Sequence, residues 1–163
     1  MKEMNTVFCE ATDRQLDEIL KIYEEVKGGI FCTWDRYYPA KENITEDHDA
    51  KDLFVLMNEE EIVGVISIVP QRELDDQPFW KKRTEAAEIA RVCIRNKYQG
   101  KGYAKILVSS AIEELKRRGI RCIHLSVAKK NLPAQRTYLR LGFEKVGESM
   151  MYGGSYYLME SIL

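Results

Sequence analysis

The sequence predicts an α/β protein in which a mixed central β-sheet is flanked by helices on both faces. Two strand–turn–helix units indicate this class: an apolar strand over residues 88–94 precedes a helical pattern over 102–118, and an alternating strand over 123–128 precedes a second helix. Two hairpins, within residues 53–69 and 145–162, add antiparallel strands. The chain has no internal repeat, so a solenoid is excluded.

The elements before the first unit follow from local signals. A strand is expected over residues 7–10, and the spacing from Thr12 to Gln15 is that of a capping box that opens a helix. One apolar face of that helix, which Gly28 and Gly29 end, consists of Leu16, Ile19, Leu20, Tyr23 and Val26. A short helix is expected near 44–51, then strands over 53–58 and 62–69 joined by a turn at 59–61, and a charged excursion over 71–83.

The composition favours one globular domain over residues 1–163, since 163 residues with 45% hydrophobic content can bury a core. With 25 basic and 26 acidic residues there is no electrostatic footprint for nucleic acid. The apolar run over 62–69 is far below the roughly 20 residues of a membrane helix, and the charged start does not resemble a signal peptide. We expect a cytoplasmic protein without a membrane partner; the oligomeric state stays open, with a homodimer as one candidate.

The cysteines and histidines suggest neither disulfides nor a metal site. The four cysteines form no C-x-x-C pair and are interpreted as reduced thiols; they are Cys9, Cys32, Cys93 and Cys122. His48 and His124 are isolated in the sequence, and His124, inside a strand pattern, is interpreted as structural. We therefore expect no metal.

The most informative segment is the glycine loop at residues 99–104. Glycines between a strand and a helix allow the backbone to approach a phosphate, which the free amides and the dipole of the helix N-terminus attract. Tyr103 and Ala104 follow Gly102, so this is not a nucleotide P-loop, and Lys105 replaces the third glycine of a dinucleotide fingerprint. Taken alone, the loop is equally compatible with simple turn chemistry.

A second segment makes the pattern specific. Asn131 has the position of an N-cap, Pro133 lies in the first helical turn, and Gly142 ends the helix. Gln99-x-x-Gly102-x-Ala104 followed by Asn131-x-x-Ala134-x-x-x-Tyr138-x-x-x-Gly142-Phe143 resembles the paired signature of the GNAT superfamily, the acyl-CoA-dependent N-acyltransferases. The resemblance covers the C-terminal half directly and implies the GNAT fold, with element order βααβββαβαββ.

The resemblance also implies a cofactor site for acetyl-CoA. The amides from Gly100 to Lys105 would cradle the pyrophosphate, and backbone groups of Val92 and Ile94 would pair with the pantetheine arm. The Ile94 amide would face the thioester oxygen, and Asn131 would bind the same arm in addition to capping its helix. The complete expected set is Val92, Ile94, Gln99, Gly100, Lys101, Gly102, Tyr103, Ala104, Lys105, Asn131 and Tyr138.

Two side chains are candidates for proton transfer. By resemblance, Tyr138 would protonate the leaving thiolate, whereas spacing alone favours a core aromatic. An amine of pKa ~10.4 must lose a proton before it attacks. Residues 88–94 resemble the base-bearing strand of histone-type GNAT enzymes, which makes Glu88 the candidate base. Strand alternation would place Glu88 on one face with Ala90, Val92 and Ile94, an apolar setting that raises a carboxyl pKa; the alternative is a solvated glutamate at a strand end.

The resemblance also implies an acceptor site around residues 34–39, where three aromatic residues suit an organic cation, Trp34, Tyr37 and Tyr38. The acidic loop with Glu73, Asp75 and Asp76 is a further candidate, against its reading as a solvated charged loop. Ser126 occupies a position where family members that acetylate protein N-termini often carry glutamate, so that activity is less favoured.

The sequence thus favours an acetyl-CoA-dependent N-acetyltransferase that acts on a small amine or a lysine-like amino group by direct attack. The main alternative is a non-catalytic acyl-CoA-binding or sensing module on the same fold. A third reading is an interaction protein that uses the aromatic residues at 34–39. The identity of the acceptor, and whether the acyl group is acetyl or longer, stay open.

Overall fold

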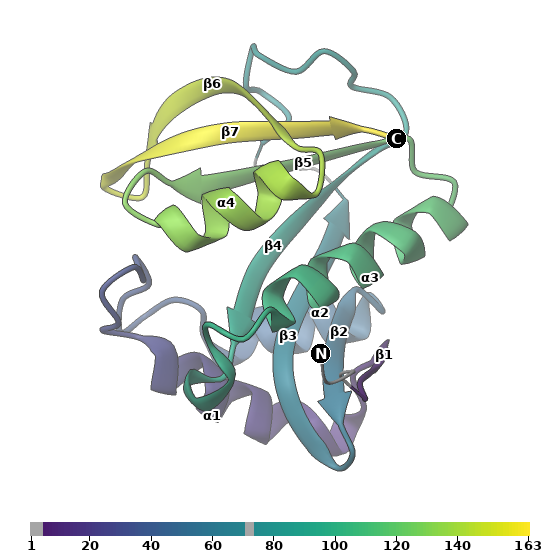
Figure 1. Cartoon of the computed structure of the whole chain (residues 1–163), viewed down its shortest axis with the longest axis vertical. Helices are drawn as coiled ribbons and strands as arrows, with labels where there is room; N and C mark the ends of the chain where they lie inside the picture. Colours follow the sequence, from purple (N-terminus) through teal and green to yellow (C-terminus); the bar gives the residue numbers. More distant parts are fainter. Residues whose placement is uncertain (1–4, 71–73) are drawn as a thin grey trace. The chain divides into compact units, whose positions relative to one another are not determined.

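The structure is a computed structural model that describes residues 5–70 and 74–163, and it has the predicted element order (Figure 1). The strands are β1 (Val7–Glu10), β2 (Leu53–Asn58), β3 (Glu61–Pro70), β4 (Ala86–Ile94), β5 (Cys122–Ala128), β6 (Glu144–Met151) and β7 (Gly154–Ile162). The helices are α1 (Leu16–Val26), α2 (Lys41–Asp49), α3 (Tyr103–Arg117) and α4 (Leu132–Arg140), with short 3-10 helices η1 (Asp13–Gln15) and η2 (Asn96–Tyr98).

In the described part of the chain, the strands form a seven-stranded sheet in the order β1-β2-β3-β4-β5-β7-β6. β4 pairs with β5 in parallel, whereas β1 with β2, β2 with β3, β5 with β7 and β6 with β7 are antiparallel. The predicted mixed sheet is therefore confirmed. The register places Glu88 beside His124 and His124 beside Glu160, so these three residues share one face of β4, β5 and β7.

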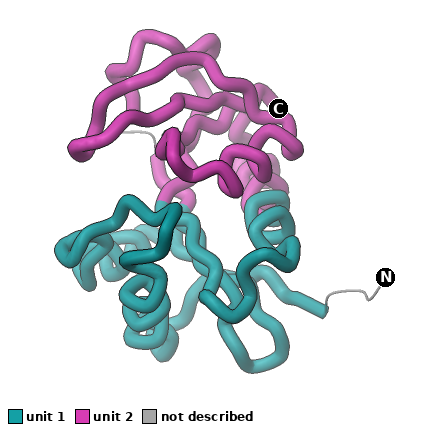
Figure 2. Tube along the Cα trace, turned by 60° about the vertical axis from the view of Figure 1, so that its left-hand side comes forward, with its two compact units in different colours: residues 1–67, 91–110 teal, residues 68–90, 111–163 magenta. Residues whose placement is uncertain are grey.

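The chain divides into two compact units (Figure 2). Unit 1 consists of Met1–Ser67 and Arg91–Ser110, and unit 2 consists of Ile68–Ala90 and Ala111–Leu163. The boundaries fall inside β3, β4 and α3, so both units contain residues from both halves of the sequence. The expectation of one domain over residues 1–163 stays a prediction.

The core of unit 1 lies between its N-terminal helices and its strands. Gln15 accepts a hydrogen bond of 2.9 Å from the Thr12 amide, which confirms the predicted capping signal before α1. The apolar face of α1 includes Ile22 as well as the predicted residues, while Leu16 and Leu20 lie at its partly buried edge. The buried cluster consists of Ala11, Ile19, Ile22, Tyr23, Val26, Ile44, Leu53, Val55, Ile62, Val65 and Cys93.

The other face of these strands approaches α3. A Cβ added at Gly64 of β3 would meet Ile94 Cδ1 at 2.7 Å and Leu107 Cδ2 of α3 at 3.2 Å. Only glycine leaves room for both side chains, so Gly64 allows β3, β4 and the first half of α3 to pack closely. Figure 1 shows α3 in front of β2 and β3 and the fainter α2 behind them, which matches the predicted helices on both faces.

Two local predictions needed correction. The helix expected near 44–51 is α2 and begins earlier, because Asn43 accepts a hydrogen bond of 2.8 Å from the Ala40 amide and caps the chain at that point. The turn expected at 59–61 is shorter, since Glu61 already pairs with Asn58. Glu59 adopts a left-handed φ of 56°, which favours a two-residue hairpin turn.

Unit 2 contains the C-terminal hairpin and its own buried cluster. Tyr152 (φ 51°) and Gly153 (φ 75°) form the turn between β6 and β7, one residue earlier than the predicted glycine pair. Leu74, Trp80 and Leu158 are buried together, and Val146 and Met151 pack against them. Across the described residues, no helix is both long and apolar enough to span a bilayer.

Candidate functional site

The predicted phosphate loop lies in unit 1 between η2 and α3. Gly100 and Gly102 both have left-handed backbone angles, with φ of 74° and 90°. The Gln99 side chain folds back and donates to the Ile94 carbonyl at 2.9 Å and to Asn96 Oδ1 at 3.2 Å. Within the described residues, the amides of Gly100, Lys101 and Gly102 donate no hydrogen bond. Three amide donors therefore remain available at the start of α3.

The end of β4 carries the two residues predicted to present their backbone to the cofactor, Val92 and Ile94. Directly before them, Arg91 adopts a left-handed φ of 50° inside the strand, a conformation that non-glycine residues rarely adopt. This residue interrupts the two-residue alternation of the strand. Counting by twos, which placed Glu88 with Ala90, Val92 and Ile94, therefore cannot be extended across Arg91.

A buried polar network surrounds the Arg91 side chain. Its guanidinium donates from Nε to Asp47 Oδ2 and from Nη2 to Asp47 Oδ1, both at 2.8 Å. Ser67 donates to Asp47 Oδ2 at 2.5 Å, and Arg91 Nη1 donates to the Tyr38 hydroxyl at 3.0 Å. Burial lowers the pKa of Arg91, but the hydrogen bonds and charges of Asp47 and Tyr38 together raise it by more, so the pKa ends above its usual value and the guanidinium stays charged. No sequence pattern predicted this network.

The three aromatic residues predicted for the acceptor site have different surroundings. Trp34 packs edge-on against buried Tyr23, with ring centroids 5.4 Å apart, and so anchors the segment to the core of unit 1. Tyr38 is 39% exposed and binds Arg91 through its hydroxyl, whereas Tyr37 is 74% exposed. Of the acidic loop, Asp75 and Asp76 are exposed, and Glu73 lies outside the described residues.

The other predicted site residues lie in unit 2. Glu88 is buried in β4, with 8% of its surface exposed. Asn131 is the predicted N-cap of α4, since its side chain accepts a hydrogen bond of 3.2 Å from the Ala134 amide. Its side-chain NH2 group donates no hydrogen bond within the described part of the chain. The cap is therefore confirmed, and a donor is left over.

Tyr138 is buried in α4, and its ring packs edge-on against Phe143 at 5.7 Å between centroids. This is the core position that spacing alone favoured. Burial raises the pKa of Tyr138, so the hydroxyl stays protonated at neutral pH. Among the residues that the structure describes, none forms a hydrogen bond with the Tyr138 hydroxyl. The packed ring thus presents an unused donor.

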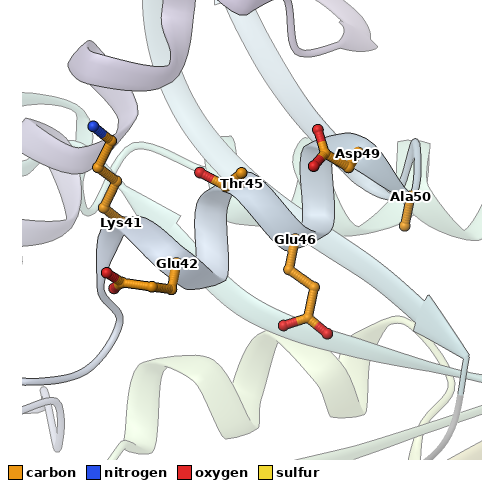
Figure 3. Close-up of a pocket in the computed structure, with 6 residues that line it drawn as sticks. All are labelled: Lys41, Glu42, Thr45, Glu46, Asp49 and Ala50. Carbon is orange, nitrogen blue, oxygen red and sulfur yellow. The ribbon is translucent and has the colours of Figure 1, made fainter.

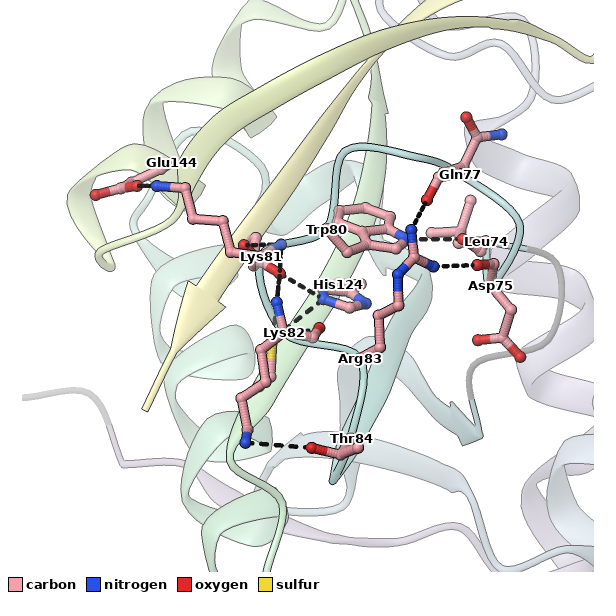
Figure 4. A network of polar contacts seen from close by, with 12 residues as sticks. Leu74, Asp75, Gln77, Trp80, Lys81, Lys82, Arg83, Thr84, His124 and Glu144 are labelled. Atoms are coloured by element: carbon pink, nitrogen blue, oxygen red, sulfur yellow. Dashed lines mark hydrogen bonds and ion pairs between the residues drawn. The ribbon is translucent and has the colours of Figure 1, made fainter.

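A second polar cluster in unit 2 joins residues that are distant in sequence (Figure 4). His124 Nε2 lies 2.8 Å from Glu160 Oε2 and 3.1 Å from Cys122 Sγ, and all three residues are buried. Glu160 also accepts the backbone amides of Lys81 and Lys82, and Trp80 stacks on His124 at 3.9 Å between centroids. His124, which is isolated in the sequence, therefore has close polar and aromatic neighbours in the structure.

The thiol, imidazole and carboxylate of this cluster are groups that can bind transition metals, but their hydrogen bonds support a structural role. The thiol, the imidazole and the two amides all donate to one carboxylate, so the negative charge of Glu160 is compensated without a cation. The cluster fixes the segment around Trp80 to the β5–β7 pair. We interpret it as structural.

An open hollow of about 860 Å³ lies on the outer side of α2 (Figure 3). Three carboxylates line it, those of Glu42, Glu46 and Asp49, along with Lys41, Thr45 and Ala50. It contains none of the predicted site residues. Because Asp47 points to the opposite, buried side of α2, the hollow and the Arg91 network use different faces of this helix.

Comparison with known proteins identifies the family. The model of the acetyltransferase (GNAT) family matches residues 16–143. The chain belongs to the GNAT acetyltransferase family. It is 29% identical over 141 residues to an uncharacterized N-acetyltransferase of Methanocaldococcus jannaschii, and these residues cover 82% of this chain and 58% of that protein. It is 28% identical over 99 residues to human N-acetyltransferase 8B, which covers 61% of this chain and 41% of that protein.

The curated relatives include mycothiol acetyltransferases as well. The one from Brachybacterium faecium is 35% identical over 102 residues, which cover 63% of this chain and 29% of that protein. This GNAT chain therefore spans less than two thirds of the length of these relatives.

Solved structures confirm the fold of this GNAT chain. A GNAT acetyltransferase of Streptococcus agalactiae superposes with a TM-score of 0.83 at 18% identity, covering 97% of this chain and 95% of that one. The yncA protein of Salmonella typhimurium, solved with its cofactor acetyl-CoA, gives a TM-score of 0.78 at 19% identity over 98% and 94% of the two chains. The predicted GNAT fold is confirmed.

Proposed function

We propose that this protein is an acetyl-CoA-dependent N-acetyltransferase that transfers an acetyl group to a primary amine of a small molecule or a lysine-like group. The observation that carries the proposal is the loop before α3, where the amides of two left-handed glycines and of Lys101 between them have no acceptor among the described residues. Such amides, at the positive end of a helix dipole, suit the pyrophosphate of acetyl-CoA. Family membership and a neighbour solved with acetyl-CoA support the same ligand.

The cofactor arm would extend from this loop along the end of β4. The proposed contacts are the backbone groups of Val92 and Ile94, with the Ile94 amide donating to the thioester oxygen. Gln99 has a supporting role, since its side chain already holds the Ile94 carbonyl at 2.9 Å. Asn131 would contribute its unused NH2 group to the same arm. The remaining contacts would come from Lys101, Tyr103, Ala104 and Lys105 beside the two glycines.

Acetyl-CoA supplies the acetyl group as a thioester, and the chain handles the protons. Glu88 would accept a proton from the ammonium, so that the neutral amine forms the C–N bond as the C–S bond breaks. The Tyr138 hydroxyl would donate a hydrogen bond to the departing sulfur. The pKa of a tyrosine already lies above that of a thiol, and burial raises the pKa of Tyr138 further, so the hydroxyl stabilises the thiolate mainly as a hydrogen-bond donor.

The acceptor would bind near residues 34–38. Tyr37 offers an exposed aromatic face beside Asp35, whose carboxylate accepts the Tyr37 amide at 2.8 Å. An aromatic ring next to a carboxylate suits an organic cation. Trp34 would then support the segment from within the core rather than touch the acceptor directly.

Release of free thiol from acetyl-CoA, measured over a panel of primary amines, tests the proposal. The panel holds diamines, amino sugars, amino acids and a lysine-containing peptide. An enzyme releases thiol in proportion to at least one amine and forms the matching acetamide. Binding of CoA without thiol release over the whole panel would favour the sensing module instead.

A further inference from the structure

Arg91 combines two features that are individually uncommon. Its backbone has a left-handed φ of 50° inside β4, and its side chain forms an almost buried ion pair with Asp47. A non-glycine residue holds such a backbone angle only where the surrounding structure compensates for the strain. The observations below identify what compensates, and all of them lie within unit 1.

The compensation comes from Asp47 of α2. The two hydrogen bonds of 2.8 Å from Nε and Nη2 to the two carboxylate oxygens form a bidentate pair, which fixes the plane of the guanidinium. The side chains are 11% and 6% exposed, so water competes weakly for either partner. Ser67 of β3 adds a third hydrogen bond to Asp47. The pair therefore ties β4 to both α2 and β3.

The same guanidinium reaches the candidate acceptor segment. Nη1, which Asp47 does not use, donates to the Tyr38 hydroxyl at 3.0 Å. Val92 and Ile94, the proposed contacts to the cofactor arm and the thioester, follow Arg91 closely in the chain. One side chain thus connects the strand end that would bind the thioester to the loop that would bind the amine.

We propose that Arg91, locked by Asp47, is a positioning residue that sets the geometry between the two substrates. This inference rests on the proposed acetyl-transfer function. Arg91 holds the irregular backbone of β4, which aims the Ile94 amide, and it also orients Tyr38. Its loss should slow transfer within the bound complex more than it weakens cofactor binding, because the pyrophosphate loop at 99–105 is a separate segment.

The principal variant is Arg91→Lys, which keeps the positive charge but loses the bidentate fork. We expect kcat to fall at least about 10-fold, while the Kd for CoA, measured by calorimetry, changes less than about threefold. Tyr38→Phe removes one oxygen at a half-exposed position and should raise KM for the amine with little effect on KM for acetyl-CoA. The matched control is Ile22→Val, a core change on α1 that lowers stability without touching the network.

A second variant keeps the test decisive if Arg91→Lys does not fold. Arg91→Gly combined with Asp47→Asn removes both buried charges and supplies a residue that adopts positive φ readily. Amide hydrogen exchange at residues 92–94 then reports the backbone without any turnover. We expect faster exchange there and unchanged exchange in β2.

The outcomes separate the two proposals. Wild-type protein that neither binds CoA nor turns over overturns the function and this inference together. Active wild type with Arg91→Lys at full kcat, or with a kcat loss no larger than that of Ile22→Val at equal thermal stability, overturns the positioning role alone. Equal losses in kcat and CoA affinity would also contradict it, because they would indicate general collapse of the site.

Discussion

His124 and Glu160 are 36 residues apart in sequence, yet they lie opposite each other on β5 and β7 and share a hydrogen bond of 2.8 Å in the interior of unit 2. Burial lowers the pKa of His124, although Glu160 partly opposes the shift. Burial alone would raise the pKa of Glu160, but hydrogen bonds from the Lys82 amide and His124 hold it below its usual value. Both shifts have consequences for stability at acid pH.

We predict that the free energy of unfolding decreases as the pH falls from 7 to about 3. In the unfolded chain His124 gains a proton below about pH 6.5, which the folded state resists, so stability is lost from that pH downward. The contribution of Glu160 is present above its unfolded pKa of about 4.3 and is lost as the pH falls through its folded value. Urea unfolding at four pH values measures the profile.

Two variants assign this pH profile. Glu160→Gln should flatten the lower part of the profile, whereas Glu144→Gln, which removes an exposed partner of Lys81, should leave it unchanged. A wild-type profile that coincides with that of Glu160→Gln would contradict the assignment.

For the phosphate loop, we predict that Gly100→Ala lowers CoA affinity at least about 10-fold, because a Cβ would intrude where the phosphate approaches the amides. Gly119→Ala is the matched control. Both glycines have left-handed φ, 74° and 81°, and no atom lies within 4 Å of an added Cβ at either position. Each substitution should cost about 1 kcal/mol of stability. Calorimetry measures the effect on CoA affinity, and thermal unfolding measures the effect on stability. Equal CoA affinity in both variants would contradict phosphate binding at this loop.

Gly102 is less suitable for this test than Gly100. Its φ of 90° means that a valine there would strain the backbone whether or not a ligand binds. Loss of binding in Gly102→Val would therefore not distinguish a ligand contact from a distorted loop.

The two roles of Asn131 can be separated by Asn131→Asp. Aspartate still accepts the Ala134 amide, so helix stability should change little, whereas Asn131→Ala should cost about 1 kcal/mol. Because Asn131→Asp loses the NH2 donor, we expect the Kd for CoA to rise several-fold. If Asn131→Asp binds CoA as tightly as wild type does, Asn131 is a helix cap and nothing more.

Tyr138→Phe keeps the ring and its packing on Phe143, so stability and CoA binding should change little. Turnover of an unactivated amine should fall about 10²-fold if the hydroxyl assists departure of the thiolate. Steady-state release of CoA with one confirmed acceptor measures this. Equal rates under conditions where chemistry limits turnover would leave Tyr138 as a core aromatic.

Removal of a general base at Glu88 should lower the rate about 10²-fold near neutral pH and affect CoA affinity little. The defect of Glu88→Gln should shrink at high pH, where more of the amine is already neutral. The pH–rate profiles of wild type and variant measure this. If the two profiles coincide, another group accepts the proton.

The sequence predicted those parts of the fold that depend on local chemistry. The Asn131 cap, the capping box at Thr12 and the hairpins follow from residues a few positions apart. The left-handed φ of Arg91 could not be predicted, since arginine gives no signal for it and its partner Asp47 lies 44 residues away in a polar helix. The contact of His124 with Glu160 likewise depends on strand register rather than on local pattern.

The most direct test of the account is a calorimetric titration of acetyl-CoA into the protein. The amides of Gly100, Lys101 and Gly102, which have no acceptor in the described part of the chain, predict one binding site per chain. Free CoA should compete for this site because the pyrophosphate carries the recognition. Affinity should fall in Gly100→Ala and stay unchanged in Gly119→Ala. Absence of binding to folded wild-type protein, or binding that both variants leave intact, would contradict the central claim that this loop holds acetyl-CoA.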